Sequence, residues 1–123
     1  MKKNVLIAGA SGAIGKEFTK LYSDDPSVDK IITLSTKKNI SSHKKIQSEE
    51  VDYSNEETFE NLDKILQLES ISTIMIATGI LHADEIKPEK SIDAINFDNL
   101  KKVFQVNVFG PTLLIKKLLP LIK

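Results

Sequence analysis

The chain has 123 residues, which fits one domain, and none of them is cysteine, which excludes disulfides and thiol chemistry. Seventeen basic residues balance seventeen acidic ones, and this balance argues against a nucleic-acid or membrane partner. The first apolar run is too short for a signal peptide or a membrane span, so the sequence predicts a cytoplasmic protein.

The chain begins with a predicted strand, glycine turn and helix. Residues 5–8 are a short apolar run, typical of a strand buried on both faces. Gly9 would permit a tight exit from this strand, Gly12 a close approach of the backbone to a pyrophosphate, and Gly15 close packing of the helix on the sheet. This order presents free backbone N–H groups to a phosphate at a helix N-terminus. A plain structural turn is the alternative.

The first helix and the next two strands follow in order. Helical spacing places Ile14, Phe18, Leu21 and Tyr22 on the apolar face of the helix. Residues 31–34 are predicted to form a second strand, and polar residues follow it. Residues 46–51 are predicted to form a third, with Asp52 at its carboxyl end.

Two helices and one strand complete the chain. Ser54 and Glu57, three residues apart, predict a capping box that starts the second helix. Its buried stripe would be Phe59, Leu62, Ile65 and Leu66. Residues 71–77 are predicted to form a fourth strand, residues 84–91 a surface loop, and residues from about 97 to the end one long helix.

The alternation of strands and helices predicts an α/β fold, a Rossmann-type doubly wound parallel sheet. About four strands are expected, in the order 3-2-1-4. No later stretch is predicted to form a strand beside the fourth, which would leave an exposed apolar edge. The sequence is therefore interpreted as a truncated sheet, the first half of a larger one.

Asn107 lies on the predicted apolar face of the last helix, which runs through Leu100, Phe104, Pro111, Leu114 and Leu118. A buried amide needs hydrogen-bond partners. Pro111, four residues later, has no N–H for the Asn107 carbonyl, so a helix kink and a bound water are predicted there. A core asparagine satisfied by the neighbouring backbone is the alternative.

With these elements in order, the chain resembles the N-terminal half of the short-chain dehydrogenase/reductase family, and most of all its C-factor-like branch. The resemblance is carried by Gly9-x-x-Gly12-x-x-Gly15, by Ala77-Thr78-Gly79 after the fourth strand, and by Val106-Asn107-Val108-Phe109-Gly110-Pro111 in the last helix. It implies an NAD(P)-dependent oxidoreductase that transfers a hydride between its cofactor and a small-molecule carbonyl or alcohol substrate.

The resemblance also implies roles for individual residues. It assigns Asn107 as a catalytic residue that holds a water in the proton relay. Asp52 would hydrogen-bond the adenine ring with Tyr53 beside it, although an aspartate that caps a turn is the alternative. Ser11 would line the pyrophosphate or, alternatively, be a turn residue in water. The implied cofactor-binding residues are Gly9, Ser11, Gly12, Ile14, Gly15, Ser35, Lys37, Asp52, Tyr53, Ala77, Thr78 and Gly79.

The end of the second strand predicts which nicotinamide cofactor binds. An NAD-preferring site carries an acidic residue there, whereas this chain has Ser35, Thr36, Lys37 and Lys38. A lysine attracts the 2′-phosphate of NADP(H), so NADP(H) is favoured over NAD(H). A solvated lysine pair is the alternative.

The catalytic Tyr-x-x-x-Lys of the family is absent, since neither Tyr22 nor Tyr53 has a lysine four residues later. Residues 1–123 are therefore interpreted as the cofactor-binding part of one domain whose catalytic half is missing. The alternatives are a catalytically inactive NADP-binding module and a truncated remnant that folds poorly. His43 and His82 are isolated, so no metal site is predicted. The resemblance allows a homo-oligomer, whose usual contacts in the family involve the last helix.

Overall fold

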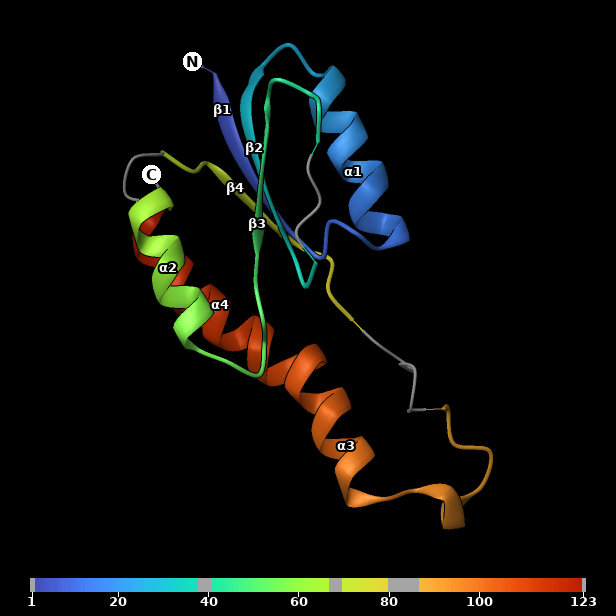
Figure 1. Ribbon diagram of the computed structural model, residues 1–123. Coiled ribbons are helices and arrows are strands. Elements are labelled where there is room, and N and C mark those ends of the chain that lie inside the picture. Colours follow the sequence, from blue (N-terminus) through green and yellow to red (C-terminus); the bar gives the residue numbers. More distant parts are fainter. Residues whose placement is uncertain (1, 38–40, 67–69, 80–86, 123) are drawn as a thin grey trace.

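The computed structural model describes residues 2–37, 41–66, 70–79 and 87–122, apart from the side chains of residues 61 and 64–66 (Figure 1). Predictions about Lys38, His82, the first part of the loop at residues 84–91, and the side chains of Ile65 and Leu66 lie outside this description.

Four parallel strands form one sheet in the order β3-β2-β1-β4, as predicted. They are β1 (Lys3–Ala8), β2 (Val28–Ser35), β3 (Ile46–Glu50) and β4 (Thr73–Ile76). Because the strands are parallel and in register, the residues that follow them meet at one edge of the sheet.

The central strand β1 is buried on both faces, which confirms the interpretation of its apolar run. Its last four residues are completely buried. Val5 and Ile7 point to one side of the sheet, and Leu6 and Ala8 to the other, since successive strand residues alternate.

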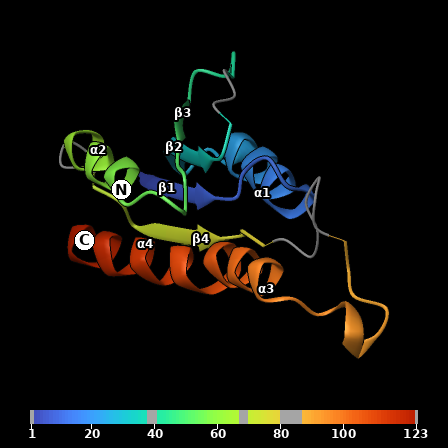
Figure 2. The same cartoon turned by 60° about the horizontal axis from the view of Figure 1, so that its bottom comes forward.

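Helices cover both faces of the sheet (Figures 1 and 2). Helix α1 (Ala13–Asp24) covers the face of Val5 and Ile7 through Phe18 and Tyr22. The predicted apolar face of this helix is wrong at its other two positions, because Ile14 and Leu21 are 66% and 63% exposed. Phe18 and Tyr22, which are four residues apart, pack against the sheet. The apolar face that contacts the sheet is therefore narrower than the amphipathic spacing predicted.

Helices α2 (Glu57–Leu66) and α4 (Gly110–Leu118) cover the opposite face. The predicted capping box at Ser54 is wrong. The backbone N–H and hydroxyl of Ser54 both donate to Asp52 Oδ1, at 2.9 and 2.6 Å, in the turn that precedes the helix. The Asn55 side chain accepts from the Glu57 N–H instead, at 3.0 Å, and α2 begins at Glu57.

The single long helix predicted from residue 97 is divided. Helix α3 (Phe97–Phe104) is followed by a π-helical turn (Gln105–Phe109), by α4, and by a 3-10 turn (Leu119–Leu121). The Gly110 N–H donates to the carbonyl of Gln105, five residues back. The next residue, Pro111, has no N–H to continue a regular ladder, so the disturbance predicted at this point takes the form of a π turn.

Only the second part of this long element packs on the sheet. Pro111, Leu114 and Leu118 are buried, whereas α3 extends past the carboxyl edge of the sheet (Figure 1). Phe104 is consequently half-exposed, and Asn107 is exposed. The expectation that Asn107 lies among core residues is therefore wrong, because this part of the element extends towards the carboxyl edge of the sheet, where the side chain is exposed.

No strand of the described residues pairs with the free edge of β4, but Ile122 forms an isolated parallel bridge with Ile71. Ile71 lies just before the amino end of β4, so the bridge is outside the strand itself. Within the described ranges, no helix has the length and apolar character needed to cross a bilayer.

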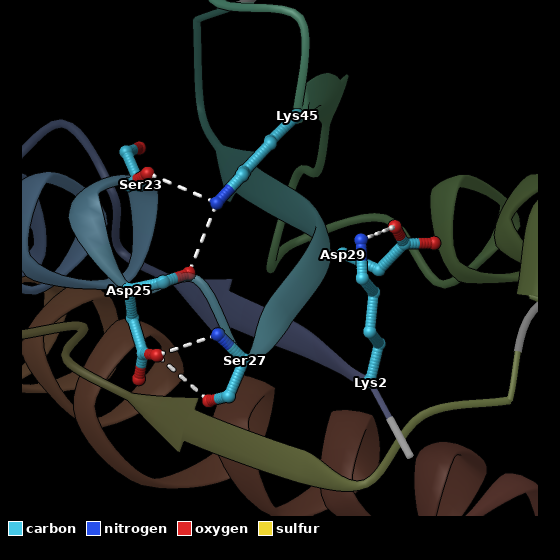
Figure 3. A network of polar contacts seen from close by, with 6 residues as sticks. All are labelled: Lys2, Ser23, Asp25, Ser27, Asp29 and Lys45. Atoms are coloured by element: carbon cyan, nitrogen blue, oxygen red, sulfur yellow. Dashed lines mark hydrogen bonds and ion pairs between the residues drawn. The ribbon is translucent and has the colours of Figure 1, made fainter.

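A polar network fixes the C-terminal end of α1 to the amino edge of the sheet (Figure 3). The Lys45 amine donates to the carbonyls of Ser23 and Asp25, at 3.2 and 2.9 Å, where the helix ends. Hydrogen bonds from Ser27 lower the pKa of the Asp25 carboxyl. These contacts hold the helix whose opposite end forms the glycine turn.

Candidate functional site

The glycine turn after β1 is built from backbone contacts too close for a side chain. Gly9 has φ = +79°, and a Cβ there would lie 2.6 Å from the carbonyl carbon of Ala77. A Cβ on Gly15 would lie 2.1 Å from the Gly9 carbonyl oxygen. Gly9 thus makes the tight exit from the strand, and Gly15 brings α1 close to that exit.

Gly12 differs from Gly9 and Gly15, because a side chain at this position would not clash with the backbone. A Cβ at Gly12 would meet only the Gly9 carbonyl oxygen, at 3.5 Å. Gly12 is also the N-cap of α1, and no side chain caps this end of the helix. The Lys16 N–H donates to the Gly12 carbonyl and starts the helical ladder, so the preceding N–H groups of the first turn lack intrahelical acceptors. The open approach and these N–H groups are suited to a phosphate.

A cleft of about 120 Å³ lies at this carboxyl edge and joins the ends of all four strands. It brings together seven of the residues predicted to bind a cofactor: Gly9, Ser11, Ser35, Tyr53, Ala77, Thr78 and Gly79. Thr36 and Val106 also line it and were not predicted as site residues. The signal for Val106 was its place directly before Asn107 in the last-helix motif.

Tyr53 is held in this cleft from several sides and is only 5% exposed. Its ring meets Phe59 edge-on, with centroids 6.1 Å apart. A Cβ on Gly110 would lie 2.4 Å from Tyr53 Cδ1, so α4 approaches the ring as closely as a glycine allows. The Gln105 side-chain amide donates to the Tyr53 carbonyl. The π turn therefore places Gln105, at its start, and Gly110, directly after its end, against Tyr53.

The hydroxyls of Tyr53 and Thr78 are buried in this cleft, and neither has a hydrogen-bond partner among the described residues. Burial raises the pKa of Tyr53 to about 12, and a weak hydrogen-bonding interaction with the adjacent Thr78 hydroxyl, short of a regular hydrogen bond, opposes part of that rise. An unsatisfied buried hydroxyl costs about 1–3 kcal/mol. A ligand with polar groups would relieve this cost, so the pair fits a nucleotide cofactor.

Four predicted site residues lie outside the cleft lining, in addition to Gly12 and Gly15. Asp52 is exposed, and hydrogen bonds from Ser54 hold the pKa of its carboxyl below the usual value. The turn-capping role left open for Asp52 is thus present in the structure. Ile14 is exposed at the start of α1. Lys37 is exposed, and its carbonyl accepts from the Ser35 hydroxyl at 2.6 Å.

Asn107, the fourth of these residues, lies beside the end of β4. A Cβ on Gly79 would be 3.7 Å from Asn107 Oδ1, so the exposed amide borders the same edge of the sheet as the cleft. Its role in a proton relay stays a prediction. Across the residues that the structure describes, no group of three or more histidine or acidic side chains is arranged to hold a metal ion.

Residues 4–99 match the family model described as "Semialdehyde dehydrogenase, NAD binding domain". No curated protein matches the chain. A short-chain dehydrogenase family protein from Francisella tularensis subsp. tularensis SCHU S4 is similar in structure, with a TM-score of 0.82 and 24% identity over 100% of this chain and 48% of that chain. The NADPH-bound carbonyl reductase from chicken fatty liver gives a TM-score of 0.78 and 16% identity over 98% of this chain and 48% of that one.

Aldohexose dehydrogenase from Thermoplasma acidophilum, in ligand-free form, gives a TM-score of 0.76 and 25% identity over 97% of this chain and 44% of that one. The chain thus spans about half the length of these solved structures. The likenesses confirm the predicted Rossmann-type fold and the resemblance to short-chain dehydrogenases.

Proposed function

Because the chain belongs to the family of semialdehyde dehydrogenase NAD-binding domains and has the fold of short-chain dehydrogenases, we propose that it is the cofactor-binding part of an NADP(H)-dependent oxidoreductase. The substrate of the whole protein is a small carbonyl compound or the corresponding alcohol, and the cytoplasmic location stays a prediction.

One observation carries the proposal. The buried hydroxyls of Tyr53 and Thr78, for which the described part of the chain supplies no regular hydrogen bond, line a cleft that begins at the glycine turn. Gly12 and the first-turn N–H groups of α1 would hold the pyrophosphate, and the two hydroxyls would contact polar atoms of the adenosine part. The cofactor, when bound, supplies hydride transfer, and the protein supplies its position.

The choice of NADP(H) rests on the end of β2. Ser35 and Thr36 line the cleft where an NAD-preferring site would carry a carboxylate, and Lys37 follows them. The family description names NAD, and the structure of the chicken carbonyl reductase holds NADPH. The absence of an acidic side chain at this strand end in the sequence supports NADP(H) over NAD(H) for this chain.

Two residues outside the cleft lining have proposed roles of their own. The exposed Asn107 amide, beside Gly79, would hold a water of the proton relay. Asp52 would contact the adenine ring through the carboxylate oxygen that Ser54 does not engage, since both Ser54 bonds end on Oδ1.

Residues 1–123 contain no Tyr-x-x-x-Lys, so we propose that this chain alone binds its cofactor and turns over little substrate. Loss of a general acid typically lowers the rate by about two to four orders of magnitude.

Calorimetric titration of the chain with NADPH and with NADH tests the proposal. We expect saturable binding of both, with tighter binding of NADPH. The matched variant Gly12→Val should bind neither, because its side chain would occupy the space above the turn. Absence of binding by the folded wild-type chain would refute the cofactor role, and equal or tighter binding of NADH would refute the preference.

A further inference from the structure

Gln105 connects the last helical element of the chain to the turn after β3, and no prediction from the sequence named it. It is the first residue of the π turn and is half-buried. Its side-chain amide donates to the backbone carbonyl of Tyr53, which lies 52 residues away in the chain. Among the residues that the structure describes, no backbone N–H donates to this carbonyl. The Gln105 amide therefore supplies the bond that a regular ladder would otherwise provide.

The π turn brings a second contact to the same tyrosine. Gly110 lies five residues after Gln105, and a Cβ there would lie 2.6 Å from Tyr53 Cβ. The Gly110 N–H donates to the Gln105 carbonyl, so the turn brings residues five apart to the same side. In an α-helix of about 3.6 residues per turn, residues five apart point in different directions. The π turn thus lets Gln105 hold the main chain of Tyr53 while Gly110 packs on its ring.

The position of Tyr53 decides where its hydroxyl meets a ligand. Tyr53 lies between β3 and α2 and belongs to neither, so no strand or helix fixes its main chain. Its hydroxyl is buried in the cleft, as is that of Thr78. A hydrogen bond weakens steeply when its donor and acceptor are misaligned. A small displacement of the Tyr53 main chain therefore lowers the affinity for a ligand that this hydroxyl contacts.

We propose that Gln105 is a positioning residue of the cofactor cleft and that it acts through Tyr53. Its amide holds the Tyr53 main chain, so that the Tyr53 hydroxyl is aligned with the adenosine part of the cofactor. The inference rests on the proposed function and deepens it. Gln105 does not line the cleft itself. The π turn thus contributes to cofactor affinity through a residue that does not touch the cofactor.

The test measures NADPH binding by calorimetry for Gln105→Met, which keeps the length of the side chain and removes its donor. Gln47→Met is the matched control, because the Gln47 side chain is also half-buried and donates to Glu49 Oε1, at 3.2 Å, outside the cleft. Loss of the bond that positions Tyr53 predicts about 2–10-fold weaker binding by Gln105→Met. Gln47→Met should match the wild type within about twofold.

The same measurements in the Tyr53→Phe background show whether Gln105 acts through the Tyr53 hydroxyl. Without that hydroxyl, Gln105→Met should change the affinity by less than about twofold. A structural role unrelated to the hydroxyl would instead lower the affinity by the same factor in both backgrounds. That result would overturn the proposal, as would unchanged NADPH binding by Gln105→Met in the wild-type background.

The wild-type chain provides a test that holds even where Gln105→Met does not fold. The ¹H–¹⁵N signals of the Gln105 side-chain amide should shift when NADP⁺ binds, and those of Gln47 should not. An unmoved Gln105 signal at saturating cofactor would overturn the role of Gln105 while the cofactor proposal stands. A folded wild-type chain that binds neither NADPH nor NADP⁺ would overturn the cofactor proposal itself.

Discussion

Replacement of Tyr53 by phenylalanine separates the stability of the fold from its affinity for a cofactor. The variant removes only the hydroxyl group, whose oxygen is buried and forms no regular hydrogen bond with the described residues. The ring contacts with Phe59 and Gly110 remain, since they involve ring carbons. The loss of the hydroxyl therefore has opposite effects on the free chain and on its complex.

The magnitudes follow from the environment of the hydroxyl. An unsatisfied buried polar group costs about 1–3 kcal/mol, so Tyr53→Phe should raise the free energy of unfolding of the free chain by about 1 kcal/mol. A net hydrogen bond to the ligand contributes about 0.5–1.5 kcal/mol, which predicts weaker NADPH binding by a factor of about 2–12.

The alkaline limb of stability gives an independent measure. Burial raises the pKa of Tyr53 from 10.0 to about 12, so the unfolded chain releases this proton at lower pH than the folded chain. The contribution of the protonated Tyr53 side chain to the free energy of unfolding is fully present below pH 10. It is lost as the pH rises from 10 towards 12. A shift of two units corresponds to about 2.7 kcal/mol. This loss should disappear in Tyr53→Phe.

Urea unfolding at pH 7 and at pH 11, with calorimetric titration of NADPH at pH 7, measures all three effects. Tyr22→Phe is the matched control, because it removes the hydroxyl of the other tyrosine, on α1 and outside the cleft. Destabilisation of Tyr53→Phe at pH 7, or NADPH affinity equal to that of the wild type, would contradict the assignment of this hydroxyl to the cofactor.

Three further predictions test separate parts of the structure. Gly12→Val should leave the melting temperature nearly unchanged, whereas Gly15→Ala should destabilise the fold by about 3 kcal/mol, because its added methyl group meets the Gly9 carbonyl oxygen. Thermal unfolding followed by circular dichroism compares the two variants, and equal stabilities would refute the packing argument. Hydrogen bonds from Ser54 lower the pKa of Asp52 in the folded chain. The ionised carboxylate therefore stabilises the fold above its unfolded pKa, and this effect is lost as the pH falls through the lower folded pKa. The free energy of unfolding of Asp52→Asn should fall less steeply with acid than that of the wild type, and an unchanged acid-unfolding curve would contradict this. The half-exposed Phe104 of α3 predicts self-association, which Phe104→Ser should weaken in sedimentation velocity. A monomeric wild type would refute this prediction.

The sequence predicted the centre of the fold because its signals there are local. The apolar run at residues 5–8 needed no knowledge of its neighbours to indicate a strand buried on both faces. Gly9 and Gly15 followed from the tight turn that this strand and α1 require, and the structure gives each a contact that excludes a Cβ. The strand order then brings the polar residues after each strand to one edge.

The errors arise where a periodic pattern depends on what lies beneath it. Helical spacing placed Asn107 and Phe104 on the same face as Leu114, but only Leu114 has the sheet under it. Leu21 is exposed on α1 for the same reason. Periodicity identifies the residues that share a face of a helix, and tertiary structure decides how much of that face is covered.

The remaining errors and omissions involve hydrogen bonds and contacts that a periodic pattern does not contain. Ser54 satisfies the sequence pattern of a capping box, yet its hydrogen-bonding groups are engaged by Asp52. Gln105 and Gly110 contact Tyr53 from a segment far away in the sequence. No single stretch of sequence contains these contacts.

The central claim is that a nicotinamide dinucleotide binds at the carboxyl edge of the sheet, over the glycine turn. Two-dimensional ¹H–¹⁵N NMR of the labelled chain, titrated with NADP⁺, tests it most directly. We predict that the largest shifts affect the amides of residues 9–15 and 77–79, with smaller shifts at residues 35–37. Shifts confined to α2 and α4, or an unchanged spectrum at saturating cofactor, would contradict it.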